Sequence, residues 1–228
     1  MEAIILAGGF GTRLRSVLND RPKPMALISG RPFLEILLCS LAAKGFSRVV
    51  MSLGYMANKI SSHFGSKYQG LEIDYVVEDI PLGTGGAVRL SLEACKKEHI
   101  FVFNGDTYLD VEIDLLEQQW KNRGNQIIVA REVTDTARYG RLVVDNNRVI
   151  NFAEKNFCGP GLINAGCYVL LKKSLSRFPI NHPFSLEVDY LAHEVKQNLV
   201  EVFVTNATFI DIGVPMDLIK AQTLLVAK

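Results

Sequence analysis

The sequence predicts an α/β fold: a single-domain, Rossmann-like mixed, mostly parallel sheet with helices on both faces. Two observations support this prediction. Through the first half of the 228 residues, short apolar runs rich in β-branched residues alternate with longer amphipathic stretches. Parallel strands joined by crossover helices produce this alternation, because such strands are buried on both faces. In addition, no tract rich in Gly, Ser or Pro divides the chain into parts.

The first half is expected to alternate four strands with four helices. Residues 3–6 form an apolar run typical of a strand. The first helix, residues 32–45, begins at a proline and ends at a glycine, which is the usual asymmetry of helix ends. The same patterns predict strands at 48–53, 72–77 and 100–103 and helices at 57–64, 85–94 and 115–122.

After residue 125 the pattern changes to a succession of strands. Asp145-Asn146-Asn147 is a turn signal between two of them, and Pro215 marks the first turn of the last helix. Strands are expected at 126–132, 140–144, 148–154 and 162–171, and helices at 187–197 and 215–226. We expect residues 1–228 to form one domain.

Composition excludes several classes of function. The formal net charge is +1, so the chain has no electrostatic footprint for nucleic acid or for an anionic membrane. The apolar run at the N-terminus is about five residues, too short for a signal-peptide core or a membrane span. The four cysteines form no CxxC pair and no zinc spacing, which favours reduced thiols and a cytoplasmic protein.

A glycine-rich tract follows the first strand directly, as Leu6-Ala7-Gly8-Gly9-Phe10-Gly11-Thr12-Arg13-Leu14. Glycines here let backbone N–H groups approach phosphate oxygens, and Arg13 adds a cationic fork suited to phosphate. Two prolines hold Lys23 in Pro22-Lys23-Pro24. A Walker A loop is absent, and the third glycine of a dinucleotide fingerprint is missing. The tract therefore predicts phosphate binding of another kind; an ordinary turn is the competing interpretation.

These motifs resemble those of the sugar nucleotidyltransferases, the nucleotide-diphospho-sugar pyrophosphorylases, whose signature is LAGGxGTRL followed by PKP. The resemblance extends along nearly the whole chain, although residues 15–20 depart from the family's PLT-like tract. Later landmarks stand in the family's order: Pro81 to Ala87, Asn104-Gly105-Asp106, Tyr139-Gly140, Glu154-Lys155, Asn164-Ala165-Gly166 and Asp211 to Pro215. The resemblance implies the nucleotide-diphospho-sugar transferase fold, with transfer of a nucleotide to a sugar 1-phosphate and release of pyrophosphate.

The resemblance also assigns roles to particular residues. A nucleotide-binding half spans about residues 1–110 and a sugar-phosphate-binding half about 111–228. The implied catalytic residues are Arg13, Lys23, Asp106 and Asp211. The implied nucleotide-binding residues are Leu6, Ala7, Gly8, Gly9, Gly11, Thr12, Arg13, Glu78, Gly83 and Thr84, and the sugar-phosphate-binding residues are Gly140, Glu154, Lys155 and Asn164.

Asp106 and Asp211 are the implied ligands of a Mg²⁺ cofactor. Asp106 follows a predicted strand, and Asp211 lies in a second turn about a hundred residues later. Mg²⁺ prefers a few carboxylate oxygens together with water and substrate phosphates, which fits such a pair. Taken alone, each is more often a turn or N-cap aspartate. No histidine lies in the motifs, and none is required, because a phosphate monoester near neutral pH is already largely dianionic.

Glu78 bears on the choice of base. A carboxylate only accepts hydrogen bonds, and guanine offers two adjacent N–H donors on one edge where uracil and thymine offer one. This favours GTP, although uridylyltransferases of the family can also carry an acid at this position. Gly83, Gly85 and Gly86 are expected to let the flat base approach the backbone.

Within the family, the motifs look most like those of bacterial D-glycero-α-D-manno-heptose 1-phosphate guanylyltransferases, which would make GTP and that sugar phosphate the partners. Mannose 1-phosphate guanylyltransferase and uridylyl- or thymidylyltransferases acting on a hexose 1-phosphate are the alternatives. A different class is a catalytically inactive regulator that binds sugar nucleotides. No nucleic acid or membrane partner is expected, and the sequence leaves open whether the chain forms a homo-oligomer.

Overall fold

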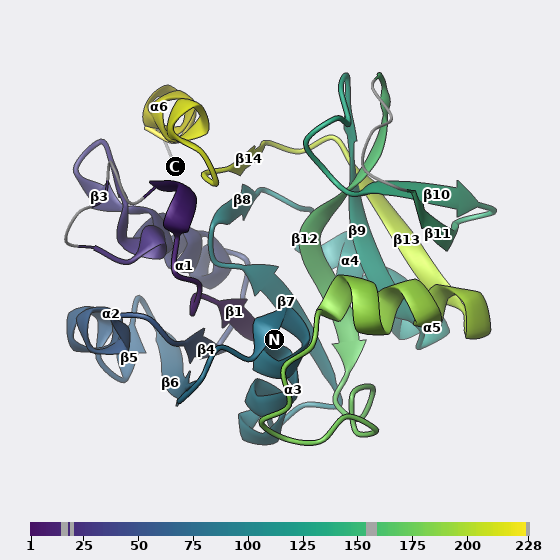
Figure 1. Cartoon of the computed structure of the whole chain (residues 1–228), viewed down its shortest axis with the longest axis horizontal. Helices are drawn as coiled ribbons and strands as arrows, with labels where there is room; N and C mark the ends of the chain where they lie inside the picture. The colour runs from purple at the N-terminus through teal and green to yellow at the C-terminus, as the bar shows by residue number, and fades with distance from the viewer. Residues whose placement is uncertain (15–17, 19–20, 154–158, 227–228) are drawn as a thin grey trace.

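The computed structural model describes residues 1–14, 18, 21–153 and 159–226. Within these residues, ten strands form one sheet in the order β10-β11-β13-β9-β12-β7-β1-β4-β6-β5 (Figure 1). The strands of this sheet are β1 (Glu2–Leu6), β4 (Arg48–Leu53), β5 (Lys67–Tyr68), β6 (Leu71–Val77), β7 (His99–Asn104), β9 (Gln126–Val133), β10 (Arg141–Asp145), β11 (Arg148–Ala153), β12 (Gly161–Leu171) and β13 (Val200–Thr205).

The half of the sheet formed early in the chain is parallel. Strands β6, β4, β1 and β7 run side by side in the same direction. Strand β4 is buried at all six positions and β1 at four of five, as expected of strands covered on both faces. Their carboxyl ends therefore meet at one edge, where the following loops can form a site.

The other half is mixed. Strand β12 is antiparallel to both β7 and β9, and β13 is parallel to β9. At the edge, β10 and β11 form an antiparallel hairpin whose turn places Asn146 and Asn147 at positive φ. Asparagine tolerates this left-handed region better than most residues, so the turn signal predicted at 145–147 is confirmed.

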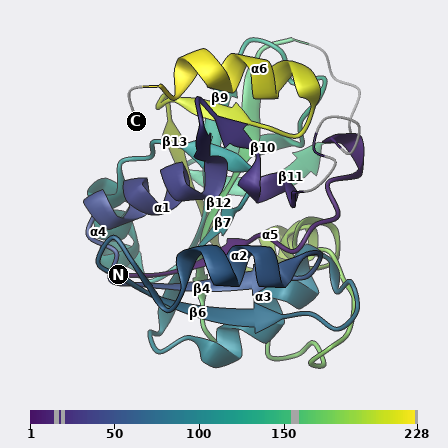
Figure 2. The ribbon, with the colours of Figure 1, turned by 90° about the vertical axis from the view of Figure 1, so that its left-hand side faces the viewer.

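The two faces of the sheet are covered by different helices (Figure 2). Helices α1 (Phe33–Ala43), α2 (Ala57–Phe64) and α4 (Ile113–Arg123) contribute to one apolar cluster. Helix α3 (Gly83–Ala94), the π-helical segment Leu186–Leu191 and α5 (Ala192–Gln197) contribute to the cluster on the other face. The predicted α/β sheet with helices on both faces is confirmed.

A third apolar cluster joins the two ends of the chain. Helix α6 (Pro215–Leu224) shares this cluster with α1, since Leu218 of α6 and Phe33 of α1 both belong to it. Between them lie two small antiparallel pairs, β2 (Leu27–Ile28) with β3 (Arg31–Pro32), and β8 (Thr107–Leu109) with β14 (Phe209–Asp211). The pairing of β8 with β14 brings residues 106 and 211 together.

Most expected elements are present with ends shifted by one or two residues. Strand β4 and helix α2 have the predicted bounds. The helix expected at 187–197 begins as a π-helix over Leu186–Leu191. Strand β13 and the short strands β8 and β14 were not predicted. In the described part of the chain, no helix has the length and apolar character required to span a membrane.

Candidate active site

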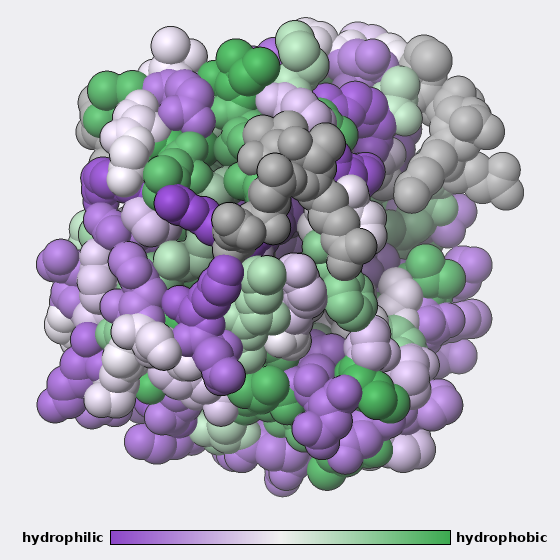
Figure 3. Space-filling model, turned by 60° about the vertical axis from the view of Figure 1, so that its left-hand side comes forward, coloured by the Kyte–Doolittle hydropathy of each residue, from purple (hydrophilic) through white to green (hydrophobic). Residues whose placement is uncertain are grey.

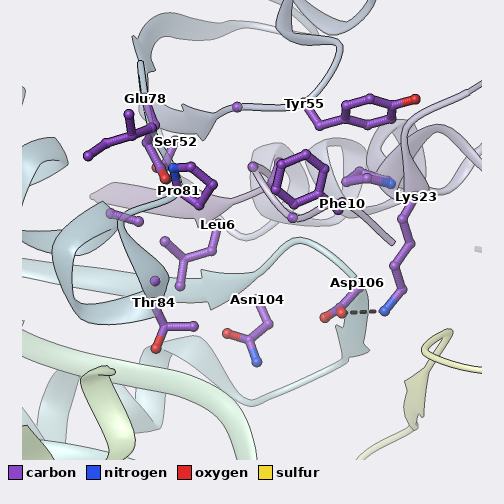
Figure 4. Close-up of a pocket in the computed structure, with 18 of the residues that line it drawn as sticks. Leu6, Phe10, Lys23, Ser52, Tyr55, Glu78, Pro81, Thr84, Asn104 and Asp106 are labelled. Atoms are coloured by element: carbon purple, nitrogen blue, oxygen red, sulfur yellow. Dashed lines mark hydrogen bonds and ion pairs between the residues drawn. The ribbon is translucent and has the colours of Figure 1, made fainter. Parts of the chain in front are cut away.

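A pocket of about 480 Å³ opens at the carboxyl ends of the parallel strands (Figure 4). Its wall comes from the loops after β1, β4 and β6 and from the end of β7. Nine of the residues predicted for the site line it: Leu6, Ala7, Gly8, Gly9, Lys23, Glu78, Gly83, Thr84 and Asp106. The described residues lining it do not include Gly11, Thr12 or Arg13, and they do not include the sugar-side residues.

Gly8 and Gly54 allow the loops after β1 and β4 to pack backbone against backbone. A Cβ on Gly54 would lie 2.9 Å from the Gly8 carbonyl oxygen, and a Cβ on Gly8 would lie 3.1 Å from the Gly54 nitrogen. Hydrogen bonds from Ala7 N–H to Ser52 O and from Tyr55 N–H to Gly8 O fix this contact. A Cβ on Gly9 would meet no described atom within 4 Å, so the loop is open on that side.

Lys23 lies against Gly11 and extends to the floor of the pocket. Gly11 has φ +59°, and a Cβ there would lie 2.9 Å from Lys23 Cβ. The lysine begins a short 3-10 helix, Lys23–Met25, directly after Pro22. Its side chain is 11% exposed, so its charge is held at one place rather than in bulk solvent.

Lys23 faces two carboxylates. Its Nζ lies 2.5 Å from Asp106 Oδ2 and 4.0 Å from Asp211 Oδ1. The aspartates adjoin because Asp211 pairs with Thr107 in the β8–β14 ladder and Ile212 N–H donates to Asp106 O. Two carboxylates and one ammonium carry a formal charge of −1, which suits a cation. Among the described residues, no group of three or more His, Cys, Asp and Glu side chains is arranged to hold a metal ion.

The pKa of the Asp211 carboxyl is raised from its ordinary value. Burial raises the pKa of its carboxyl, and the charge of Asp106 raises that pKa further. The ammonium of Lys23, the Gly213 N–H and the guanidinium of Arg13 act in the opposite direction. Arg13 is exposed and does not line the pocket, but its charge acts on Asp211.

Glu78 is partly buried at the opposite end of the pocket from Lys23. Its Oε2 accepts a hydrogen bond from Leu82 N–H at 2.8 Å, and its Oε1 accepts from the Ser52 hydroxyl at 3.3 Å. Burial raises the pKa of Glu78, while both hydrogen bonds oppose that shift. Each carboxylate oxygen can accept a second bond, so the carboxylate can still meet donors of a base.

The glycines of the 83–86 loop have a different role from the one expected. A Cβ on Gly85 would lie 2.2 Å from the Phe184 ring, and one on Gly86 would lie 2.7 Å from the His182 carbonyl oxygen. Gly83, with φ +70°, lines the pocket but would also meet Phe184 O at 2.6 Å. The expectation that Gly85 and Gly86 admit the base is therefore wrong: these glycines let α3 pack on residues 182–186.

The sugar-side residues lie beyond this pocket. Asn164 N–H donates to Gly140 O at 3.0 Å, which joins β12 to the residue before β10. Asp211 lines a neighbouring hollow of about 540 Å³ that is also lined by Tyr139, Asp217 and Lys220. Glu154 and Lys155 lie outside the described residues. The predicted residues that the structure describes therefore extend from this pocket, through the two aspartates, toward β12.

Several pocket residues were not assigned from sequence, and three of them bear on ligand binding: Phe10, Tyr55 and Asn104. Phe10 and Tyr55 place their rings at the mouth, with centroids 5.5 Å apart (Figure 4). Phe10 is 46% exposed, so it offers an apolar surface to a flat ligand. Asn104 lines the pocket between Thr84 and Asp106, and its Oδ1 is buried without a hydrogen-bond partner among the described residues. Phe10 and Asn104 lie inside family motifs, and this position is the signal that could have indicated them. Tyr55 lies in none of the motifs, so the sequence carried no such signal for it.

The nucleotidyl transferase family model matches residues 2–228, which is nearly the whole chain. The chain belongs to the nucleotidyl transferase family. It is 38% identical to the D-glycero-α-D-manno-heptose 1-phosphate guanylyltransferase of Aneurinibacillus thermoaerophilus, with 97% of both chains covered. It is 32% identical to the mannose-1-phosphate guanylyltransferase of Mycobacterium tuberculosis, covering 99% of this chain and 65% of that protein.

A solved structure is similar over the same length. The crystal structure of HddC from Yersinia pseudotuberculosis, complexed with GMP-PN, matches with a TM-score of 0.86 and 39% identity. The match covers 97% of each chain. The surface of this nucleotidyl transferase shows no dominance of one residue class on the face in Figure 3, where hydrophilic and hydrophobic residues are interspersed.

Proposed function

We propose that this nucleotidyl transferase joins GTP and D-glycero-α-D-manno-heptose 1-phosphate to give GDP-heptose and pyrophosphate. The observation that carries the chemistry is the convergence of Lys23 and Asp106, which line the pocket bordered by the glycine loop, with Asp211, which lines the neighbouring hollow. The similarity to guanylyltransferases of that heptose phosphate over nearly the whole chain supports the substrates. A similar chain complexed with GMP-PN supports the guanine base.

In this reaction an oxygen of the sugar phosphate forms a bond to the α-phosphorus of GTP. The bond between that phosphorus and the α–β bridging oxygen breaks, and pyrophosphate leaves with the oxygen. The nucleophile is an anion, so the protein supplies position and positive charge rather than a base. Lys23 is placed to neutralise phosphate charge, and Arg13 adds a second cation on the side of Asp211. Backbone N–H groups at Gly8 and Gly9 are available to phosphate oxygens.

We propose Mg²⁺ as the cofactor, held by Asp106 and Asp211. The net negative charge of their cluster with Lys23 and the oxygen-only donor set fit a hard divalent cation. When bound, such an ion neutralises the charge that accumulates on the phosphates. We place the reaction in the cytoplasm, since the thiols of Cys39, Cys95 and Cys167 are free.

A pyrophosphate-release assay tests the assignment. The protein with Mg²⁺ is supplied with GTP, UTP, dTTP, CTP or ATP, each combined with heptose, mannose, glucose or N-acetylglucosamine 1-phosphate. We expect release with GTP and the manno-heptose phosphate. Release with mannose 1-phosphate alone would replace the sugar, and release with UTP or dTTP alone would replace the base. Binding of nucleotide without release from any pair would favour an inactive regulator.

Glu78→Gln is expected to lower kcat/KM for GTP about tenfold and to affect any residual activity with UTP less. A carboxylate meets both donors of guanine, whereas the glutamine amide can accept only one of them and presents an N–H₂ group to the other. The Leu82 N–H can still donate to the amide oxygen, so folding should be preserved. Steady-state kinetics with both nucleotides measures the ratio. Equal losses for GTP and UTP would contradict the role in base selection.

The same variant should be more stable than the wild type at neutral pH. Because burial raises the pKa of Glu78 in the folded chain, its ionised form opposes folding above that pKa, and this cost vanishes at acid pH. The difference in melting temperature between Glu78→Gln and the wild type should therefore shrink as the pH falls. A difference independent of pH would contradict the buried charge as its cause.

A further inference from the structure

A chain of hydrogen bonds joins the nucleotide pocket to Asn164 through two side chains that the proposed reaction does not use. Thr84 Oγ, in the first turn of α3, donates to Glu187 Oε2 at 2.7 Å. Tyr168 Oη donates to Glu187 Oε1 at 3.2 Å, and Asn164 Nδ2 donates to Tyr168 Oη at 2.8 Å. One carboxylate therefore connects a residue that lines the nucleotide pocket with a residue predicted for the sugar phosphate.

The direction of these bonds is set by Glu187. An ionised carboxylate only accepts, so Tyr168 must give its proton to Glu187 and keep its lone pairs for Asn164. Asn164 then turns its NH₂ group toward Tyr168 and its Oδ1 toward Gly166 N–H, which donates to it at 3.1 Å. Glu187, acting through Tyr168, and Gly166 N–H therefore favour the same orientation of the Asn164 amide.

Tyr168 is suited to transmit this constraint. It is fully buried on β12, where it pairs with Val102 of β7 and Ile128 of β9. Burial and the charge of Glu187 raise the pKa of Tyr168 well above its ordinary value, so the hydroxyl keeps its proton. A buried hydroxyl that lost a partner would carry a free-energy cost, because no water can replace that partner.

We propose that Glu187 is a positioning residue that orients Asn164 toward the sugar phosphate. The same carboxylate holds the hydroxyl of Thr84 and so fixes that side chain in the wall of the nucleotide pocket. This inference rests on the proposed function. It assigns Glu187 no contact with either substrate.

The alternative is that Glu187 only fastens the π-helix to α3. Other contacts already do this. Gly85 N–H donates to Phe184 O, Phe184 N–H donates to Leu82 O, and the missing side chain of Gly85 makes room for the Phe184 ring. Leu186 N–H also donates to Thr84 Oγ, so Thr84 keeps one bond when Glu187 is altered. Substitution of Glu187 should therefore leave the fold in place.

Glu187→Gln should disturb Asn164 more than Thr84. Oε2 of Glu187 accepts two hydroxyl protons, from Thr84 and from Ser185 at 3.0 Å. Among the described residues, Oε1 accepts the proton of Tyr168 alone. The amide oxygen of the glutamine therefore takes the Oε2 position, and its NH₂ group faces Tyr168. Tyr168 would then accept that bond and donate to Asn164, whose amide must turn away from Gly166 N–H.

The test compares Glu187→Gln, Tyr168→Phe and Asn164→Ala, with Ser185→Ala as the matched control. Ser185 donates to the same carboxylate and caps the same π-helix through Val188 N–H, but it lies off the path to Asn164. We expect KM for the sugar phosphate to rise about tenfold in the first two variants. KM for GTP should change less than about threefold in them, and Ser185→Ala should resemble the wild type.

The double variant Tyr168→Phe with Asn164→Ala tests whether the effect passes through Asn164. If it does, the double variant should be no worse than Asn164→Ala alone, because residues in one network are not additive. Fully additive losses would overturn the proposal. Equal increases of KM for the sugar phosphate and for GTP, also seen in Ser185→Ala, would overturn it too. Glu187 would then have only a structural role, holding the π-helix against α3.

A spectroscopic readout separates this proposal from the proposed function. The side-chain NH₂ resonances of Asn164, assigned by their loss in Asn164→Ala, should shift in Glu187→Gln and Tyr168→Phe and stay in place in Ser185→Ala. Unshifted resonances would contradict the positioning role whatever the enzyme's substrates. An inactive wild type with shifted resonances would contradict the proposed function alone.

Discussion

Asp106→Asn is expected to reduce kcat by about a thousandfold, the scale observed when one preorganised electrostatic group is removed from an active site. Asparagine keeps the shape of Asp106 and removes its charge, so the cluster with Lys23 and Asp211 changes from a formal charge of −1 to 0. A neutral cluster should hold Mg²⁺ weakly. We therefore expect two changes in this variant: kcat falls, and the Mg²⁺ concentration needed for half-maximal rate rises.

Asp110→Asn is a matched control for this variant. The Asp110 carboxylate pairs with Lys44 at 2.9 Å and is 28% exposed, against 34% for Asp106. It lies four residues further along the chain, and it does not line the described nucleotide pocket. The control should lose an ion pair of similar kind while keeping wild-type kcat and Mg²⁺ dependence. Turnover by Asp106→Asn at the rate of Asp110→Asn would show that the metal assignment is wrong.

The fold could be predicted where one stretch of sequence determines one element. Strand β4 is buried at every position, and its apolar run gave the observed bounds. Helix α1 follows a proline and ends just before Lys44 and Gly45, where φ of the glycine is +81°. In these elements, burial and the special backbone preferences of glycine and proline act locally. Patterns within a short window are therefore sufficient.

Elements whose partners lie far along the chain could not be predicted in this way. Strand β13 pairs with β9, more than seventy residues earlier, and β14 pairs with β8 over three residues. That short ladder brings Asp106 and Asp211 together, and no local pattern indicates it. The resemblance to a family identified both aspartates as site residues, but it did not indicate how they are arranged in space. Glu187 was not assigned a role, because its connection to Thr84 and Tyr168 exists only after residues 84 and 187 are brought together.

Lys23→Met is expected to lower kcat/KM by about a hundredfold or more, because it removes the partly buried cation that we propose to neutralise the phosphates. Lys44→Met is the matched control, since Lys44 pairs with Asp110 away from the described pocket. Methionine retains most of the length of the lysine side chain, so the packing against Gly11 should persist. Loss of activity in both variants alike would indicate general damage to the fold rather than a role at the site.

The pH dependence of kcat/KM in Lys23→Met tests whether Lys23 also acts on the ionisation of Asp211. Burial and Asp106 raise the pKa of Asp211, whereas Lys23 lowers it. Activity that needs the Asp211 carboxylate is lost as the pH falls through that pKa, so removal of Lys23 should move the acid limb to higher pH. The profile of kcat/KM from about pH 5 to pH 8 reports groups of the free enzyme and substrate. The phosphate substrates titrate identically with every variant, so a shift present in Lys23→Met and absent in Lys44→Met arises from the protein. An unshifted acid limb would mean that Asp211 is not coupled to Lys23 in the working enzyme.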